Sequence, residues 1–336
     1  MTQVFTPKVL VIVLNYRTPQ MALQAVDAAL RDMPKDRAEL VIVDNASGDG
    51  SAAILAREVA AKGWDKDNRV RLILSDVNGG FGAGNNIGLR AGMSDGSSPD
   101  YYYLLNSDAF PDRGCLPELL RHMQITSKAG FVGSHVRGAD GEDHTTAFRF
   151  PSIAGEFEGA ARFGPITRML RHAVVAPALP TQPARVDWVA GASVLIRASM
   201  LEDIGLFDET FFLYFEETEL CKRGAKAGWE CWYLPQARVV HIGSVSTGMK
   251  EWRRIPAYWY ASRRHYFTKT HGRAYAAAAL CAKSAGGLLH SLRCALTGQP
   301  RQDPPGFYRD LIRFGLGLPL RRDTSPDRNS VPKETP

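Results

Sequence analysis

The sequence predicts an α/β fold with a mixed, mainly parallel sheet flanked by helices and a basic helical extension behind it. Three observations support this prediction. Apolar and amphipathic segments alternate over the first 75 residues, polar turns follow several of the apolar segments, and the charge balance changes near residue 250. Alternation of this kind is typical of sheets covered by helices on both faces.

The opening of the chain carries the clearest secondary-structure pattern. β-branched apolar runs at 9–14, 40–43 and 70–74 predict strands, and residues 20–32 and 52–62 between them predict helices, the second capped by Ser51. The β-α-β-α-β order predicts parallel strands joined by right-handed crossovers.

The later segments are expected to extend this sheet. The predicted strands there cover residues 101–105, 130–136, 194–197 and 229–234. Residues 138–180 lack a clear period, so we expect loops and one short helix there.

Composition narrows the class of protein. Hydrophobic residues make up 45% and charged residues 23% of 336, which is usual for a globular chain. No run of eighteen apolar residues is present, and residues 1–8 do not have the pattern of a signal peptide. Five cysteines without a Cys-x-x-Cys pair favour reduced, buried thiols over disulfides or a zinc site.

Charge is distributed unevenly along the chain. Residues 250–322 hold fourteen Lys or Arg and three acidic residues, a net +11 that leaves −5 for the rest of this +6 chain. Such a block predicts an anionic partner, either membrane lipid or nucleic acid. It contains no known nucleic-acid-binding module, so we expect no nucleic acid and favour an anionic membrane surface.

Three segments follow from this charge step. We predict an α/β domain over 1–250, a basic amphipathic helical extension over 251–318 and a disordered tail over 319–336. Within the extension, residues 274–297 predict a long helix that lies in a membrane surface or packs on the domain.

The apolar strand at 101–105 ends in Asn106, Ser107 and Asp108. Ligands of open α/β sheets bind outside the carboxyl ends of the strands. A carboxylate placed there can hold a divalent cation, and Mg²⁺ prefers oxygen ligands and phosphate partners. The alternative is that this triplet is only a turn or a helix cap.

Two further segments have the chemistry of a nucleotide site. Asp44 ends the second strand, where an acid commonly bonds a ribose or a base, although it could also cap a helix. Glycines at 79–84 let the backbone approach a ligand closely, although the spacing is neither Gly-x-Gly-x-x-Gly, because residue 85 is Asn, nor a Walker loop. A simple flexible loop is the alternative.

The segment 211–221 brings three carboxylates together, those of Glu216, Glu217 and Glu219, directly after an aromatic run. Carboxylates this close are costly to ionise together unless they are solvated or used, although acids also favour a helix start. Trp188 suits a sugar ring or a protein core. His241, a lone histidine after two valines, is more often structural than a ligand.

Together these segments resemble the inverting glycosyltransferases of family 2, which have the GT-A fold, and especially bacterial rhamnosyltransferases. The resemblance covers residues 7–250 and, loosely, the chain to Gly272. The segments that carry it are 13–16 (VLNY), 43–47 (VDNAS), 78–86 (NGGFGAGNN), 104–108 (LLNSD), 191–197 (GASVLIR), 211–221 (FFLYFEETELC) and His241.

The resemblance implies a donor site and a metal site. Asp44 would bind the nucleotide base, and Asp108, the last residue of the family's Asp-x-Asp motif, would bind Mg²⁺ or Mn²⁺ together with His241. Because Asn106 stands at the first motif position, we expect one direct carboxylate ligand rather than two. The other residues expected around the donor nucleotide are Asn15, Tyr16, Arg17, Asn45, Gly80, Asn85, Asn106 and Ser107.

The resemblance also implies an acceptor side. Glu217 would be the base, although the family more often has Asp at this position, so Glu216 and Glu219 are possible substitutes. Trp188 and Gly191 would contact the acceptor. A metal neutralises the donor diphosphate, and the base takes the proton of the acceptor hydroxyl.

These roles predict a transferase of cell-surface polysaccharide synthesis, cytoplasmic and peripheral on the inner face of the plasma membrane. Its donor is a nucleotide sugar, first dTDP-rhamnose and then UDP-sugars, and its acceptor is a glycan or a lipid-diphosphate-linked sugar. Two alternatives remain open. One is a non-catalytic glycan- or nucleotide-binding protein on the same fold, and the other is a sugar nucleotidyltransferase.

Overall fold

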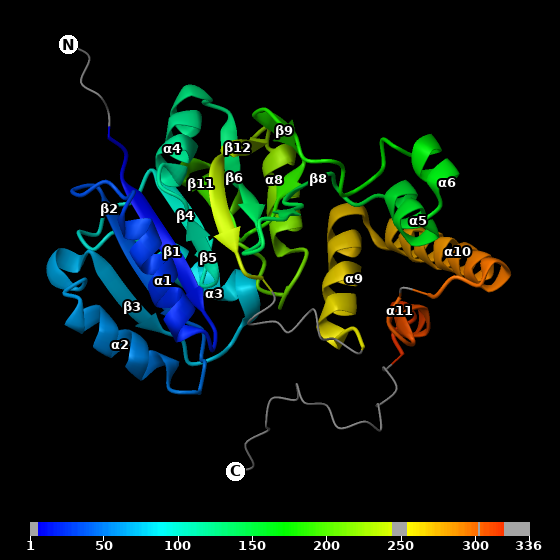
Figure 1. Ribbon diagram of the computed structural model, residues 1–336, viewed down its shortest axis with the longest axis horizontal. Helices are drawn as coiled ribbons and strands as arrows, with labels where there is room; N and C mark the ends of the chain where they lie inside the picture. Colours follow the sequence, from blue (N-terminus) through cyan, green and yellow to red (C-terminus); the bar gives the residue numbers. More distant parts are fainter. Residues whose placement is uncertain (1–5, 244–253, 302, 319–336) are drawn as a thin grey trace.

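The computed structural model describes residues 6–243, 254–301 and 303–318, which form an α/β body with a group of helices at one end (Figure 1). The strands of the main sheet are β1 (Val9–Asn15), β2 (Ala38–Asp44), β3 (Val70–Leu74), β4 (Tyr101–Asn106), β5 (Ala109–Pro111), β6 (Ala129–Arg137), β7 (Asp143–His144), β9 (Ala184–Val186), β11 (Ser193–Arg197) and β12 (Glu230–His241). A separate pair consists of β8 (Ala147–Phe148) and β10 (Trp188–Val189).

The sheet has the order β3-β2-β1-β4-β11-β6-β12-β5. Strands β1 to β4 run parallel, β11 is antiparallel to both of its neighbours, and β12 is parallel to β6. The short edge strand β5 pairs antiparallel with the end of β12. The predicted mixed, mainly parallel sheet is therefore confirmed.

Helices cover both faces of the sheet because their apolar sides match its two sets of alternating side chains. The helices of the body are α1 (Pro19–Leu30), α2 (Ser51–Ala61), α3 (Gly80–Ala91), α4 (Cys115–Ile125), α7 (Ala198–Ile204) and α8 (Glu216–Lys226), with a 3₁₀ turn at Lys66–Asn68. One core lies under α1, α2 and α4, and the other lies under α3, α7 and α8.

Three local predictions were wrong. Gly50, with φ of 89°, caps α2, so Ser51 is the first helical residue rather than the cap. The strand predicted at 229–234 is too short, because β12 continues to His241 with a shift of its register against β6 between Leu234 and Arg238. Residues 138–180 contain two helices, α5 (Ile153–Ala161) and α6 (Gly164–Met169), rather than one.

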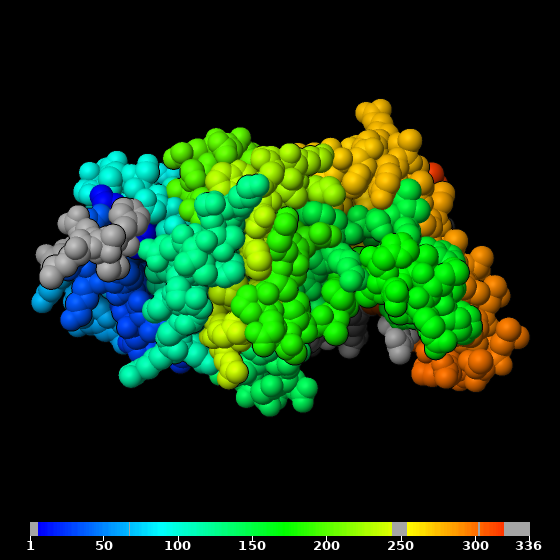
Figure 2. All heavy atoms as spheres, turned by 90° about the horizontal axis from the view of Figure 1, so that it is seen from above, coloured from blue at the N-terminus to red at the C-terminus, as the bar shows by residue number. Residues whose placement is uncertain are grey.

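The C-terminal helices pack closely against the body. They are α9 (Ala257–His271), α10 (Arg273–Thr297) and α11 (Phe307–Gly315). Helix α10 lies along α5 and also contacts α9 and α11, and Figure 2 shows these orange and red segments at the end opposite the blue strands. Within the described ranges, no helix combines the length and apolar character needed to span a bilayer.

The division at 1–250 and 251–318 remains a prediction, since its boundary falls in residues outside the described ranges. The same holds for the tail at 319–336. Across that division, the buried Arg263 guanidinium of α9 donates to Glu156 of α5 through Nε at 3.0 Å. Lys283 of α10 lies 3.5 Å from the same carboxylate, so one buried acid joins three helices.

This buried ion pair predicts a large stability effect. We expect Arg263→Met to lower the free energy of unfolding by about 3 kcal/mol, because the Glu156 charge stays buried with a weaker partner. The double variant Arg263→Met/Glu156→Leu should recover much of this loss. Arg57→Met, which breaks an exposed pair with Glu58, is the control and should change stability by less than about 0.5 kcal/mol. Denaturant unfolding measures all three, and equal losses for Arg263→Met and Arg57→Met would contradict the prediction.

Candidate functional site

The end of β2 holds a buried carboxylate in a network of side chains. Asp44 Oδ1 accepts hydrogen bonds from Asn15 Nδ2 and from the Ser47 hydroxyl, both at 2.6 Å. Arg17 has a positive φ of 59°, and its backbone N–H and Nε donate to Ser47 at 2.9 Å. Its guanidinium lies 5.1 Å from the ring centre of Tyr16. The 15–17 loop is thereby fixed beside Asp44.

Asn45, next in the chain, has an acceptor without a partner. Its Nδ2 donates to Asn78 Oδ1 at 2.9 Å and to the Gly80 carbonyl at 3.1 Å. Its Oδ1 is buried and accepts no hydrogen bond from any residue that the structure describes. A buried acceptor of this kind is costly unless a donor group supplies the bond, which fits a bound ligand.

The glycine segment (residues 78–86) packs against the acid segment (residues 211–221). Gly80 has φ of 88°, and a Cβ there would lie 1.8 Å from the Phe212 carbonyl oxygen, so only glycine fits. The N–H of Phe81 donates to that same oxygen at 2.9 Å. Asn85 is buried and donates to the Phe81 carbonyl at 3.0 Å, so its amide holds the start of α3.

The turn between β4 and β5 places Asp108 next to His241. Because β5 pairs with β12, Ala109 lies opposite His241, and His241 Nε2 is 3.0 Å from Asp108 Oδ1. Asn106 Nδ2 lies 3.4 Å from the same imidazole nitrogen. Ser107 points elsewhere, since its hydroxyl is 2.8 Å from that of Thr18.

These side chains fit a divalent metal that takes its remaining ligands from a substrate. Among the described residues, no three His, Cys, Asp or Glu side chains form a group able to hold a metal ion. Asp108 and His241 supply two suitable donor atoms within 3.0 Å of each other. Mg²⁺ and Mn²⁺ commonly complete such a shell with phosphate oxygens and water.

The two acids at the start of α8 have different surroundings. Glu217 is partly exposed, and its Oε1 accepts a hydrogen bond from the Gly191 N–H at 3.1 Å. Burial raises its pKa, and that hydrogen bond opposes the rise. Glu216 is buried, and its Oε2 has no partner among the described residues. Burial, with the neighbouring Glu217 carboxylate, raises the pKa of Glu216 well above its usual range.

A short stretch of backbone connects Glu217 to the end of β4, where the possible metal ligand Asp108 lies. The Asn106 N–H donates to the Ala192 carbonyl at 3.0 Å, and Ala192 follows Gly191. A Cβ at Gly191 would lie 2.7 Å from Glu217 Oε1 and 2.7 Å from the Phe81 ring. The structure therefore brings together the glycine segment, the end of β4, residues 191–192 and Glu217, although the chain separates them widely.

The acid segment is held in a strained conformation. Tyr214 and Phe215 both have positive φ, at 70° and 71°, which is costly for bulky side chains unless the surroundings enforce it. Helix α9 supplies that support. Its Ser262 hydroxyl donates to the Leu213 carbonyl at 3.0 Å, and its Trp259 ring lies 6.1 Å from that of Phe215.

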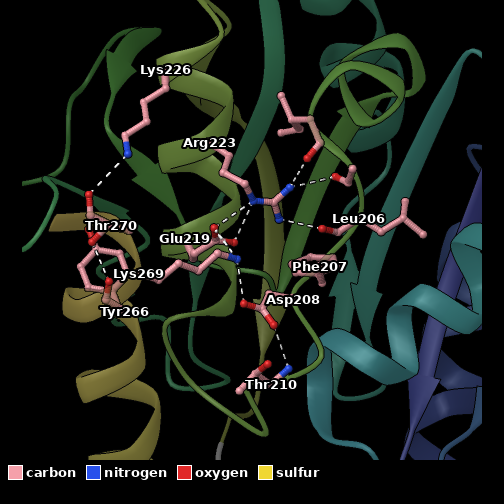
Figure 3. Close-up of polar contacts among 12 residues, drawn as sticks. Leu206, Phe207, Asp208, Thr210, Glu219, Arg223, Lys226, Tyr266, Lys269 and Thr270 are labelled. Carbon is pink, nitrogen blue, oxygen red and sulfur yellow. Dashed lines mark hydrogen bonds and ion pairs between the residues drawn. The ribbon is translucent and has the colours of Figure 1, made fainter. Parts of the chain in front are cut away.

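An ion-pair network fixes the far side of α8 (Figure 3). The buried Glu219 accepts from Arg223 Nε at 2.9 Å and lies 2.9 Å from Lys269 Nζ of α9. Lys269 also donates to Asp208 at 2.7 Å, as does His265 at 2.8 Å. Burial alone would raise the pKa of Asp208, but these two bonds lower it. Glu219 is thus engaged structurally, which does not suit the substitute base considered above.

Trp188 is partly used by the protein itself. Its indole N–H donates to the Arg149 carbonyl at 3.0 Å, and its ring stacks on Phe148 with centres 4.1 Å apart. One ring face is therefore covered, and contact with an acceptor would have to use what remains.

Several residues beside the site had not been predicted. His144 lies in the unpatterned 138–180 stretch, yet its ring centre is 6.4 Å from that of His241. Ser262 and His265 of α9 contact the acid segment and the 205–210 turn. No local sequence signal identifies them, because each acquires its place only through tertiary packing.

The buried state of Glu216 predicts how stability depends on pH. Its pKa is raised in the folded protein, so the folded state favours the protonated acid. Above pH 4.5 the unfolded chain releases this proton more readily, so wild type loses stability as pH rises toward the folded pKa. Glu216→Gln avoids that loss. Thermal melts should show a stability gain over wild type that grows between pH 4.5 and neutral pH. A difference that does not change with pH would contradict a protonated Glu216.

Comparison with known proteins finds similar sequences. The family model for Glycosyl transferase family 2 matches residues 9–173. A Mycobacterium tuberculosis protein named N-acetylglucosaminyl-diphospho-decaprenol L-rhamnosyltransferase is 28% identical over 260 residues, which are 71% of this chain and 77% of that protein. A Haloferax volcanii protein named low-salt glycan biosynthesis hexosyltransferase Agl10 is 26% identical over 192 residues, 56% of this chain and 54% of that protein.

Solved structures agree on the fold. The mannosyltransferase PcManGT from Pyrobaculum calidifontis, in complex with GDP-Man and Mn²⁺, superposes with a TM-score of 0.56 at 17% identity, covering 94% of this chain and 81% of that one. GalNAc-T7 with UDP, GalNAc and Mn²⁺ gives a TM-score of 0.52 at 14% identity, covering 71% and 44%. The chain therefore has the GT-A fold, and its residues 9–173 match the glycosyl transferase family 2 domain.

Proposed function

We propose that this protein is an inverting, metal-dependent glycosyltransferase. It moves a sugar from a nucleotide donor, with dTDP-L-rhamnose as first choice, to a hydroxyl of a glycan or lipid-diphosphate-linked acceptor. The observation that carries the proposal is the backbone route from Asn106 through Ala192 and Gly191 to Glu217. It supports a role for Glu217 as a base acting near Asp108 and His241, the residues suited to a donor diphosphate and its metal.

The choice of sugar and acceptor comes from the mycobacterial relative. Its name specifies L-rhamnose transfer to an N-acetylglucosaminyl-diphospho-decaprenol. At 28% identity this similarity supports a proposal of the same donor and acceptor classes, within cell-surface polysaccharide synthesis. UDP-sugars remain the second donor class to be tested.

The donor side of the site would bind and orient the nucleotide. Asp44 and the unpartnered Asn45 Oδ1 offer acceptors to the base or ribose, and the 15–17 loop encloses them. Asp108 and His241 would hold a divalent metal, which supplies positive charge against the leaving diphosphate. The glycine at position 80 keeps the backbone close to this region.

The acceptor side would remove a proton. Glu217, oriented by the Gly191 N–H, accepts the proton of the acceptor hydroxyl as its oxygen bonds to the anomeric carbon. The bond from that carbon to the donor phosphate breaks, and the nucleoside diphosphate leaves with the bonding pair. Attack opposite the leaving group inverts the anomeric centre, and no covalent sugar–enzyme intermediate is needed.

The two rival functions give different products. A sugar nucleotidyltransferase releases pyrophosphate, whereas sugar transfer releases a nucleoside diphosphate. A non-catalytic binding protein on this fold releases neither. A panel of sugar nucleotides, each assayed with Mg²⁺ or Mn²⁺ for binding and for released product, therefore separates all three.

We also propose that the chain works at the cytoplasmic face of the plasma membrane. An acceptor of the proposed lipid-linked class would be anchored there, and the +11 balance over 250–322 suits an anionic lipid surface.

The base assignment predicts a specific kinetic loss. We expect Glu217→Gln to lower kcat on the order of 10²–10⁴-fold with donor affinity retained, because the amide cannot accept the proton. Wild-type turnover should fall as pH drops through the raised pKa of Glu217, which protonates the base. Glu202→Gln, at an exposed position on α7, is the matched control. Equal turnover by Glu217→Gln and wild type would discard this assignment.

The contact between Gly191 and Glu217 predicts a second loss. In Gly191→Ala the new methyl group would lie 2.7 Å from Glu217 Oε1, so the carboxylate must move. We expect a fall in kcat of about tenfold or more, because small displacements of a base are costly. Gly159→Ala on α5, where a Cβ meets nothing within 4 Å, is the control. If Gly191→Ala kept full turnover, the hydrogen bond from residue 191 would not position the base.

A further inference from the structure

Helix α10 is oriented contrary to the usual rule for a surface helix. Such helices normally turn an apolar stripe to the protein and charged residues to water. In α10 the residues that face the protein include His290, which is buried, and the two basic residues of the helix interior, Lys283 and Arg293. Its outward face carries no charge between residues 274 and 296.

The inward polar residues have defined partners on the α5 segment. Lys283 Nζ lies 3.5 Å from the buried Glu156 carboxylate. Arg293 donates to the Arg162 carbonyl at 2.7 Å, and its guanidinium lies 5.0 Å from the centre of the Phe163 ring. Gly286 brings the two helices close, since a Cβ there would lie 2.5 Å from the Phe157 carbonyl oxygen. The orientation of α10 is thus fixed by specific contacts.

The outward residues form one continuous stripe. Every exposed residue between 274 and 296 is Ala, Cys or Leu. Apart from the adjacent pair Ala295 and Leu296, their spacings are three and four, which keep them on one side of the helix. This stripe, which we call the α10 apolar face, consists of Ala274, Ala277, Cys281, Ala285, Leu288, Leu292, Ala295 and Leu296. Its leucines are the most costly to leave in water, with exposed fractions of 62% for Leu288, 55% for Leu292 and 88% for Leu296.

Exposed arginines stand at both ends of this face. Arg273 begins α10 and Arg301 follows it, and neither forms an ion pair with any residue that the structure describes. A cation in the first turn opposes the helix dipole, so Arg273 is not explained by the stability of the helix itself. The nearby acids Asp303 and Asp310 are already paired, with Arg162 and Arg254 respectively.

We propose that the α10 apolar face lies in the plane of an anionic membrane, with its leucines among the lipid chains and its flanking arginines at the headgroups. An uninterrupted apolar stripe with basic residues beside it is the pattern of helices that bind membrane surfaces. Residues Ile312, Leu316 and Leu318 add exposed aliphatic side chains on and just after α11, which packs against α10. The proposal rests on the membrane part of the proposed function and specifies its contact surface.

A second copy of the chain is the competing occupant. Dimerisation through this face would bring two segments together that each carry a net +11 over residues 250–322. Like charges oppose such an approach, whereas anionic lipid neutralises them. The charge balance therefore favours lipid over self-association.

Vesicle flotation of the full chain tests the proposal. With vesicles of about one third phosphatidylglycerol in phosphatidylcholine, we expect the triple variant Leu288→Ser/Leu292→Ser/Leu296→Ser to bind at least about tenfold more weakly than wild type. The matched control, Leu74→Ser/Val77→Ser/Ile125→Ser, changes three aliphatic residues on the body with exposed fractions of 58–70% and should bind like wild type. Wild-type flotation by the α10 variant would overturn the proposal.

Cys281 allows a direct measurement on the same face, since the other four cysteines are buried. An environment-sensitive fluorophore on Cys281 should shift to shorter wavelength with anionic vesicles and not with phosphatidylcholine alone. A fluorophore at Leu74→Cys in a Cys281→Ala background should not shift. A Cys281 shift that depends on protein concentration without lipid, together with a dimer in sedimentation velocity, would assign the face to a second copy instead.

Measuring the hydrolysis of a soluble sugar-nucleotide donor tests the sugar-transfer proposal independently of the membrane-binding proposal. The α10 variant should retain wild-type donor binding and donor hydrolysis, because the substituted leucines are outside the donor and acid residues. Loss of flotation with hydrolysis retained supports the proposal. Flotation of wild type and variant alike with no turnover by either would leave neither proposal standing, whereas turnover with equal flotation removes only the membrane face.

Discussion

The hydrogen bond from the Gly191 N–H to the Glu217 carboxylate joins the two halves of the site. Residues 191–192 lead into β11, the antiparallel strand between β4 and β6. Glu217 is therefore held at a fixed position relative to the end of β4, where Asn106 and Asp108 lie. A glycine suits this position because a Cβ would lie 2.7 Å from both Glu217 Oε1 and the Phe81 ring, and these side chains would have to move. The sheet thus fixes the position of Glu217 relative to Asn106 and Asp108, which no single loop could do.

The C-terminal helices contribute to the site through the acid segment. Positive φ at Tyr214 and Phe215 turns the chain so that Glu216 enters the interior and Glu217 stays partly exposed. Each strained residue costs roughly 1–3 kcal/mol, which surrounding contacts must offset. Those contacts come largely from α9, through Ser262, His265 and Lys269. The two adjacent acids therefore have different environments. Glu216 is buried with an unpartnered Oε2 among the described residues, and Glu217 is partly exposed and hydrogen-bonded to Gly191.

Features that depend on neighbouring residues in the chain were predictable from the sequence, whereas features that depend on contacts between distant residues were not. Strands β1 to β4, α1 and the polar strand ends were predictable because periodicity and turn residues are local. His241 was expected beside Asp108 only through the family resemblance, since its position depends on β12 continuing past Pro235 and shifting register before it pairs with β5. Glu219 could not be distinguished from its neighbours by its Arg223 partner on the same helix alone, because its second partner, Lys269, comes from α9. His144 lacked any pattern at all.

The same helices present a scaffold to the body and an apolar face to the outside. These two roles cannot be separated by deleting the extension, because removal of α9 also removes the side chains that hold the strained acid segment. A deletion that abolished turnover would therefore say nothing about membranes, and a deletion that abolished flotation could act through unfolding. Substitutions confined to the outward leucines leave Lys283, Arg293 and the buried glycines of α10 in place. Only such changes test the surface while the scaffold remains intact.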